Sequence, residues 1–359
     1  MICWLRNDMR IVLYTPAFLP RIGGLEINIA SLAEQMTLSG HEIVVVTTTP
    51  GRSEEDENHP YRVVRCPSPV ELLRWTRWGD VFFQANVSLR GLWPLLLVRR
   101  PWVVSHHSWY CRPDGRIAWR DRLKRYLLRY AAASLAVSQA MAQDLGGSTG
   151  TIQNPYRDQL FRILPGVERT SDLVFLGRLV SDKGGDVLLS ALSILARDGL
   201  EPRLTIVGEG PEASRLEAHA EALDLTHRIE FLGKRQGPEL VEILNRHRLM
   251  VVPSRYDEPF GIVALEGIAC GCVVVGSEGG GLPEAIGPCG RTFKNGDAQD
   301  LARVLGELLR HPEGDDAYLR HAEQHLASHR ASIVAATHLR ILTEVVGRAK
   351  IHTKARLAA

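Results

Sequence analysis

Short runs of β-branched residues alternate with longer amphipathic stretches along nearly the whole chain, and this rhythm limits the possible folds more than any other feature. An amphipathic helix is predicted from about Leu25 to Ser39, where Gly40 closes it. Strands are predicted in the first half at 10–14, 42–47, 102–105, 135–138 and 151–153. Strands and helices that alternate at this spacing form parallel sheets with helices on both faces.

The same rhythm restarts after residue 170. Helices are predicted over 186–197 and 213–222, and strands at 173–176, 203–207, 229–231, 249–252 and 273–275. Residues 154–171 carry two prolines and no clear period, which is typical of a linker. We therefore predict an α/β protein with two facing, doubly wound Rossmann-like domains over 1–155 and 172–332, joined by a linker over 156–171. Ligands of such sheets bind at the carboxyl ends of the strands, so an interdomain cleft is the predicted site.

Length and charge agree with two soluble domains. A chain of 359 residues with 45% hydrophobic and 23% charged residues has an ordinary globular composition. The net charge of +2 excludes a polycation, and we expect no nucleic-acid partner. The halves differ, because residues 1–165 hold 20 basic and 14 acidic side chains, a net charge of +6, and the remainder has a net charge of −4.

The cysteines and the first residues bear on the cellular compartment. The six cysteines include no CxxC pair and no histidine pair at zinc spacing, so we expect free thiols and no metal site. No apolar run approaches the roughly 18 residues of a membrane span. Arg6 and Asp8 stand where a secretory signal would be apolar, which predicts a cytoplasmic protein. The first strand begins at Arg10, so either residues 1–8 form a loose extension or Met9 is the true start.

The segment 253–266 carries the strongest chemical signal. A strand ends there, a polar loop follows, and Pro259 stands where a helix can begin. The unpaired backbone N–H groups at that helix start would form an anion site: those of Phe260, Gly261, Ile262 and Val263. Glu258 and Glu266 would flank it about 12 Å apart, which suits a nucleotide sugar and exceeds the roughly 5–9.5 Å of a glycosidase pair. The alternative is that both are ordinary acids, Glu266 on a helix surface and Glu258 in a loop.

Two further turns carry groups suited to phosphate. In the segment 175–185 a strand delivers Arg178 and Lys183 to its carboxyl end, and both cations suit a diphosphate. The alternative is a loop arginine and a helix-start lysine, both in solvent. Gly23 and Gly24 would let the backbone approach a phosphate. They do not form GxGxxG, so nothing supports a nicotinamide site.

Two histidines follow the strand predicted at 102–105. A histidine at the end of a strand could touch a substrate, but His106 and His107 are adjacent and point to opposite faces, so at most one lines a site. The alternative is that both are structural histidines held by hydrogen bonds.

The basic first half contains one stretch with a membrane-like pattern. Residues 116–130 hold six basic side chains and one acid, and a helix would place Trp119, Leu123, Tyr126, Leu127 and Tyr130 on one stripe. Such a helix can lie on an anionic membrane. The alternative is that the stripe is the core face of a domain helix with a solvated basic side. We hypothesise peripheral contact with the inner face of a membrane.

Taken in order, these features resemble the family-4 retaining glycosyltransferases, which have the GT-B fold. The resemblance spans nearly the whole chain, and the block from Glu258 through Glu266 is its most specific part. The other segments that carry it are Gly23–Glu26, His107, Val137–Ser138, Asn154–Pro155, Gly177–Arg178, Lys183–Gly184, Val207–Pro211, Phe231–Gly233 and Glu266–Glu284.

The resemblance implies an activity. It implies a transferase that moves a hexosyl unit with retention from a nucleotide-diphosphate sugar, with UDP or GDP as the nucleotide, to a glycan or lipid-linked acceptor. Neither a metal nor another cofactor is expected. The alternatives on the same fold are a nucleotide-sugar 2-epimerase, which needs no acceptor, and a non-catalytic nucleotide-sugar binder.

The resemblance also implies a role for each matching residue. Arg178 and Lys183 would neutralise the diphosphate leaving group, and Glu266 would hold the ribose hydroxyls. Gly23 and Gly24 would close on the diphosphate, His107 would contact the sugar near the reacting carbon, and Arg235 would bind the base. The donor sugar and its phosphate would be held by Glu258 and by the amides of Phe260, Gly261, Ile262 and Val263.

The last helix departs from the family pattern. Relatives carry an aromatic residue near the start of the helix that crosses back to the first domain, and residues 329–333 hold none. We expect a helix within 333–359, over about 333–346, that returns to the first domain.

Overall fold

The computed structural model describes residues 8–20, 23–51, 56–111 and 115–358, with side chains as far as Ile351. The extension predicted at residues 1–8 therefore lies outside the described chain except for Asp8. The chain divides into two compact units. Unit 1 runs up to Asn154 and resumes at Ala331, and unit 2 runs from Pro155 to Arg330.

Unit 1 contains a seven-stranded parallel sheet in the order β3-β2-β1-β4-β5-β6-β7. Its strands are β1 (Arg10–Thr15), β2 (Glu42–Thr47), β3 (Arg62–Arg65), β4 (Val81–Ala85), β5 (Trp102–His106), β6 (Ala133–Ala136) and β7 (Gly150–Thr151). Its helices are α1 (Gly24–Leu38), α3 (Pro69–Trp78), α4 (Leu89–Leu92), α5 (Trp119–Leu127), α6 (Gln139–Leu145) and α15 (Ala331–Ala358). The strand order reverses between β1 and β4, so this unit has its switch point there.

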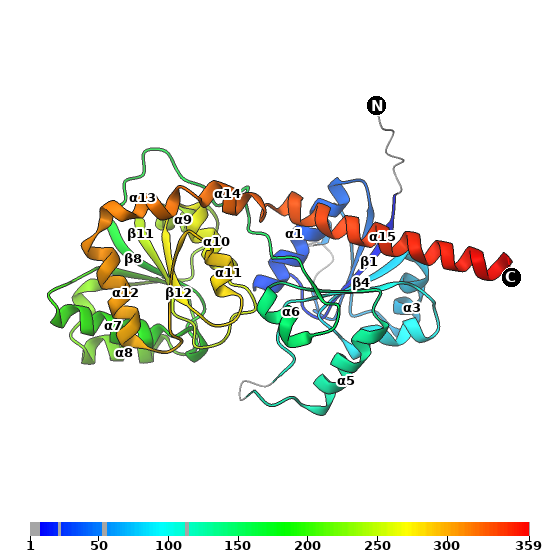
Figure 1. Cartoon of the computed structure of the whole chain (residues 1–359), viewed down its shortest axis with the longest axis horizontal. Helices are drawn as coiled ribbons and strands as arrows, with labels where there is room; N and C mark the ends of the chain where they lie inside the picture. The colour runs from blue at the N-terminus through cyan, green and yellow to red at the C-terminus, as the bar shows by residue number, and fades with distance from the viewer. Residues whose placement is uncertain (1–7, 21–22, 52–55, 112–114, 359) are drawn as a thin grey trace. The chain divides into compact units, whose positions relative to one another are not determined.

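The final helix completes the core of unit 1. Figure 1 shows α15, in red, running alongside α1, with which it is in contact. The apolar side chains of α15 join the cluster that covers one face of the sheet: Val334, Ala335, Leu339, Leu342, Val345 and Val346. The helix is longer than the predicted span of 333–346, and the missing aromatic residue does not prevent it from forming.

Unit 2 contains a six-stranded parallel sheet in the order β10-β9-β8-β11-β12-β13. Its strands are β8 (Ser171–Leu176), β9 (Leu204–Val207), β10 (Ile229–Gly233), β11 (His247–Val252), β12 (Val273–Ser277) and β13 (Gly290–Phe293). Its helices are α7 (Gly185–Arg197), α8 (Ala213–Ala222), α9 (Gly237–Asn245), α10 (Ile262–Ala269), α11 (Leu282–Ile286), α12 (Ala298–Arg310), α13 (Asp315–Leu319) and α14 (Ala322–Ala327). Its switch point lies between β8 and β11.

Two doubly wound parallel sheets confirm the predicted fold class, with differences in detail. The prediction did not include β3, β4 and β13, of which β3 and β13 are edge strands that carry arginine. Residues 155–170 belong to unit 2. Arg169 donates to the carbonyl oxygens of His247 and Cys270, and Leu164 N donates to Asn245 Oδ1.

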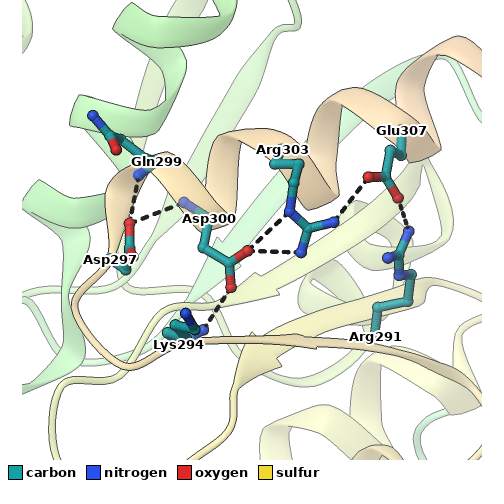
Figure 2. Close-up of polar contacts among 7 residues, drawn as sticks. All are labelled: Arg291, Lys294, Asp297, Gln299, Asp300, Arg303 and Glu307. Atoms are coloured by element: carbon teal, nitrogen blue, oxygen red, sulfur yellow. Dashed lines mark hydrogen bonds and ion pairs between the residues drawn. The ribbon is translucent and has the colours of Figure 1, made fainter.

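Helix α12 shows how a local sequence fixes an element of unit 2. The Asp297 carboxylate caps its first turn by accepting from the backbone N–H groups of Gln299 and Asp300, at 3.0 and 2.9 Å (Figure 2). Arg303 then joins Asp300 to Glu307 along the exposed face, and Arg291 of β13 pairs with Glu307. These partners hold the pKa of Glu307 below its ordinary value. The helix is thereby tied to the neighbouring edge strand.

Among the helices of the described chain, none combines the length and apolarity needed to cross a lipid bilayer.

Candidate functional site

The carboxyl ends of β8 and β11 meet at the switch point of the unit 2 sheet, and their loops are in close contact there. A Cβ atom on Gly184 would lie 1.9 Å from the Pro253 carbonyl oxygen, so only glycine fits between the two loops. Gly184 also has a left-handed backbone, with φ of 67°. Arg255 N donates to the Asp182 carbonyl oxygen at 2.9 Å. This contact fixes the position of Lys183 relative to the loop after β11.

Lys183 and Glu258 form an ion pair at this point. The Lys183 ammonium lies 2.5 Å from Glu258 Oε1, and the same oxygen accepts from Ser254 Oγ at 2.6 Å. Glu258 and Ser254 are buried, and Lys183 is partly exposed. Lys183 is therefore not a solvated helix-start lysine, and Glu258 is not an ordinary loop acid. A buried carboxylate held by two donors is a fixed acceptor beside a fixed cation.

Helix α10 begins later than the sequence predicted. It starts at Ile262, because Gly261 takes a left-handed conformation with φ of 105° that a helix cannot continue through. The Phe260 side chain is buried and lies against the ring of His329, with centroids 5.5 Å apart. Ile262 and Val263 are therefore the first two residues of the helix, and Phe260 and Gly261 precede it. That the amides of Phe260, Gly261, Ile262 and Val263 bind an anion stays a prediction.

Glu266 lies in the second turn of α10, where it is buried and paired. Arg157 donates from Nε and Nη2 to Glu266 Oε1, at 3.1 and 2.9 Å. Burial raises the pKa of Glu266, and Arg157 partly offsets this effect. The Arg157 guanidinium lies over the ring of Phe161, 4.7 Å from its centroid. The alternative of an ordinary acid on a helix surface is therefore wrong for Glu266.

The other predicted cations of unit 2 differ in their surroundings. Arg178 is exposed at the end of β8, and its side chain makes no hydrogen bond or ion pair within the described residues. Arg235 donates to Glu239 at 2.8 Å and to the Lys234 carbonyl oxygen, so it is held at the start of α9. Arg178 is thus an available cation in the segment between β8 and α7, which also carries Lys183, whereas Arg235 already has a partner in Glu239.

In unit 1, the predicted glycine turn leads directly into α1. Gly23 is the N-cap residue, and Gly24 is the first residue of the helix. A Cβ atom on Gly23 would lie 2.5 Å from Glu26 Oε2, so the buried carboxyl group of Glu26 folds back over this turn. Arg21 and Ile22, which precede the turn, lie outside the described residues.

His106 is a structural histidine at the end of β5. Val87 N donates to the Tyr110 hydroxyl at 2.8 Å, and this hydroxyl lies 2.7 Å from His106 Nδ1. Burial lowers the pKa of His106 to about 3, so the ring is neutral and accepts at Nδ1. His106 Nε2 then donates to Ser134 Oγ at 3.0 Å. The network holds the ring of Tyr110 in a single position.

His107 is the first residue after β5, which ends at His106. Asn86 Oδ1 accepts from its backbone N–H at 2.7 Å, and Nδ1 lies 3.5 Å from the amide nitrogen of Asn28. Burial lowers the pKa of His107 to about 3, so the imidazole is neutral, and a hydrogen bond with the Asn154 side chain opposes this shift. Nε2 is buried and has no hydrogen-bond partner in the described part of the chain. A buried polar atom without a partner calls for an explanation.

The basic helix α5 does not turn its stripe toward the core. Trp119, Tyr126 and Tyr130 are 69%, 49% and 66% exposed, and Leu123 is also exposed. Leu127 alone among the stripe packs against the core. The alternative of a core face is therefore wrong for most of the stripe.

Several residues of these sites were not predicted from the sequence. Arg157 follows the Asn154–Pro155 segment, and Ser254 lies inside the 253–266 segment. Asn28 and Asn154 pair with each other at 2.5 Å below His107. For Ser254 the signal was its place directly after a strand, two residues into the polar loop. The described residues contain no group of three or more His, Cys, Asp and Glu side chains that could hold a metal ion.

Comparison with protein families assigns both units. Residues 22–155 match the model described as Glycosyltransferase Family 4, and residues 157–325 match Glycosyl transferases group 1.

Individual glycosyltransferases are also similar to this chain, in sequence or in fold. The chain is 36% identical over 355 residues to a D-inositol 3-phosphate glycosyltransferase of Corynebacterium jeikeium, covering 80% of this chain and 83% of that one. It is 28% identical to a GDP-mannose-dependent alpha-(1-6)-phosphatidylinositol monomannoside mannosyltransferase of Mycolicibacterium smegmatis, covering 84% and 90%. Among solved structures, Anabaena HepE in complex with UDP matches with a TM-score of 0.80 at 20% identity, covering 94% and 100%.

Proposed function

The chain belongs to the group 1 glycosyltransferases of family 4, a retaining family, and on that premise we propose that it transfers a hexosyl unit from a nucleotide-diphosphate sugar. The proposed nucleotide is UDP or GDP. A bound UDP occurs in a similar structure, and dependence on GDP-mannose occurs in a relative. The proposed acceptor is a glycan or a lipid-linked sugar, and no metal takes part in the proposed reaction.

The observation that carries this proposal is the Lys183–Glu258 pair at the switch point of unit 2, with Arg178, which has no partner among the described residues, between β8 and α7 as Lys183 is. Two cations in the segment between β8 and α7 suit a diphosphate. As the bond from the sugar to the diphosphate breaks, negative charge grows on the departing oxygen, and fixed cations stabilise that charge. We assign this role to Arg178 and Lys183. We assign Glu258 and the amides of Phe260, Gly261, Ile262 and Val263 to the donor sugar and its phosphate.

We assign Glu266 to the ribose hydroxyls. An ionised carboxylate accepts hydrogen bonds from two neighbouring hydroxyls, and the ion pair with Arg157 favours the ionised form of this buried group against the effect of burial. Arg235 receives the weakest assignment, toward the base, because it is already paired with Glu239.

The roles of Gly23, Gly24 and His107 toward the donor rest on the family resemblance. One observation supports His107, which is that its buried Nε2 has no partner among the described residues. A sugar hydroxyl could form a hydrogen bond with this nitrogen in either tautomer. The interdomain cleft stays a prediction.

A panel of UDP-, GDP- and ADP-sugars tests the proposal. One nucleotide class should raise the melting temperature of the full chain, because a ligand that binds only the native state adds to its stability. Proton NMR of that donor with an acceptor pool should then show a new glycoside of unchanged anomeric configuration. A new epimer formed from donor alone would favour the 2-epimerase, and intact donor in every mixture would favour the non-catalytic binder.

The Glu266 assignment has its own control. Glu266→Gln should weaken binding of the matched nucleotide by about tenfold, the loss expected for a charge-assisted hydrogen bond. Glu217→Gln removes an exposed acid of α8 in the same unit and should leave binding unchanged. Equal affinity in the two variants would remove Glu266 from the nucleotide site.

We further propose that the exposed face of α5 contacts an anionic membrane. The supporting observation is the exposed row of Trp119, Leu123, Tyr126 and Tyr130 among cations, with the Arg129 guanidinium 3.7 Å from the centroid of the Tyr126 ring. Co-sedimentation with vesicles tests it. The chain should bind vesicles rich in anionic lipid and not neutral ones, and equal binding to both, or none, would contradict the proposal.

A further inference from the structure

Unit 1 contains a pocket of about 630 Å³ whose lining includes no residue assigned to the donor and shares only Trp119 with the row proposed to contact a membrane. Its walls come from the loops after β1, β4 and β5 and from the start of α5. β1 and β4 are the strands between which the order of this sheet reverses. Doubly wound sheets bind ligands at that position. The volume lies within the range of small-molecule sites.

The lining combines aromatic rings with cations. Trp109, Tyr110 and Trp119 supply the rings, and Arg90, Arg120 and Lys124 supply the positive charges. The described residues of the lining include no acid. Aromatic faces stack on the apolar faces of sugar rings, and guanidinium groups bind phosphate and carboxylate through paired donors. Neither kind of group alone would define a ligand, but together they describe a ring that carries an anion.

One wall of the pocket is rigid before any ligand binds. Tyr110 is buried, and its hydroxyl is held by Val87 N and His106. The ammonium of Lys124 lies 5.4 Å from the centroid of the Tyr110 ring and 2.9 Å from Asp121. A ligand that meets a fixed ring loses less freedom on binding than one that must order its site.

The cations differ in how far they are neutralised. Lys124 has its partner in Asp121, whereas Arg90 and Arg120 make no ion pair with a carboxylate in the described chain. Arg120 lies over the ring of Trp119, 5.4 Å from the centroid. An anionic group on a ligand could therefore pair with these two arginines.

We propose that this pocket binds the acceptor and that the acceptor is a sugar or cyclitol bearing a phosphate or carboxylate group. The identity of the ligand as acceptor rests on the proposed transferase function. The pocket's preference for an anionic ring does not, because it concerns the lining of unit 1 alone.

Isothermal titration of the full chain tests the preference. The probes are glucose 6-phosphate, myo-inositol 1-phosphate and glucuronate, compared with glucose, myo-inositol and inorganic phosphate. At least one anionic ring should bind about tenfold or more tightly than its neutral parent and than phosphate alone. Comparison of the two phosphorylated rings with glucuronate shows whether the pocket prefers a phosphate or a carboxylate. No preference for an anionic ring over its neutral parent would overturn the proposal.

A matched pair of variants locates the binding. Arg120→Gln should weaken the preferred anionic ring about tenfold, whereas Arg122→Gln, on the same helix but outside the lining, should leave it unchanged. Both arginines are exposed, so both variants should fold. Equal affinities would overturn the assignment. Nucleotide titration of the same variants separates the two hypotheses, because failure to bind any nucleotide sugar would count against the transferase and not against this pocket.

Discussion

Units 1 and 2 share one architecture, a doubly wound parallel sheet, but their charged groups are arranged differently at the two switch points. In unit 2 the acids hold cations of the same unit, as Lys183 with Glu258 and Arg157 with Glu266 show. In unit 1 two arginines of the pocket have no carboxylate partner in the described chain.

The difference extends to buried titratable groups. Unit 1 buries His106 and His338 as neutral rings, with pKa values lowered by burial to about 3 and about 4. Unit 2 buries carboxylates that are neutralised by a neighbouring cation. On the two proposals for ligand binding, a ligand would replace internal partners in unit 2, whereas in unit 1 it would supply the negative charge that Arg90 and Arg120 lack in the described chain. The comparison also indicates that acid should affect the two units unequally.

Acidification is expected to have the largest effect. A histidine whose pKa lies below its unfolded value of 6.5 binds fewer protons in the native state, so the free energy of unfolding falls as pH drops below 6.5. At pH 5, His106 and His338 would each cost about 2 kcal/mol. Hydrogen exchange, corrected for intrinsic rates, should show a larger loss of protection in β4 and β5 than in β8 and β9.

His247 provides the reference in unit 2, since burial lowers its pKa too and it contributes a loss of the same sign. His338→Phe should reduce the pH dependence of unit 1. An equal loss of protection in both units would show that the buried histidines do not distinguish them.

Removal of the lysine at the unit 2 switch point is the next largest change. Lys183→Ala should lower kcat by about 100-fold to 1,000-fold, the usual cost of losing one fixed group that stabilises a developing negative charge. The donor KM should change much less. Lys294→Ala, an exposed lysine of the same unit, is the control. Unchanged kcat would contradict the role of Lys183, and a melting temperature near that of the parent would exclude unfolding as the cause of a loss.

A substitution on α15 that leaves a cavity in the core of unit 1 should destabilise that unit selectively. Leu342 is buried in the core of that unit, so Leu342→Ala should lower the free energy of unfolding by about 2–5 kcal/mol. Ile333→Ala removes an exposed side chain of the same helix and should change it by less than about 0.5 kcal/mol. Urea unfolding followed by hydrogen exchange measures both. Loss of protection in β8 and β9 as well would mean that the units do not unfold separately.

The smallest expected effect concerns unit 2 alone. Asp297→Ala removes the cap of α12 and should cost about 1 kcal/mol in urea unfolding. Gln299→Ala alters the same turn without removing the cap. If both variants lose equal stability, the cap in Figure 2 contributes nothing beyond local helix preference.

The sequence was sufficient for the architecture because alternating periods report directly on strands and helices. The predicted bounds of β2 and α8 match the structure, and Lys183 and Glu258 were both expected at strand ends. The partner of Glu266 was beyond prediction, since Arg157 lies 109 residues away in sequence. The start of α10 depends on the left-handed Gly261, and proline patterns do not report that conformation.

The exposed stripe of α5 illustrates a different limit. An amphipathic pattern shows that a helix has an apolar side, but it does not show whether the protein covers that side. Trp119 and Tyr130 therefore fitted a core helix and a surface helix equally well until their exposure was known.

The last helix has a consequence for the order in which the chain is synthesised. Unit 1 begins at the N-terminus, but its core includes Leu342 and Val345, which follow the whole of unit 2. A ribosome that adds about 5–20 residues per second needs on the order of ten seconds or more to pass from Pro155 to Arg330. Throughout that time the apolar side chains of α1 and β1 lack their contacts with α15, which is not yet synthesised. Unit 2, although encoded second, is thus the first unit whose residues have all been synthesised.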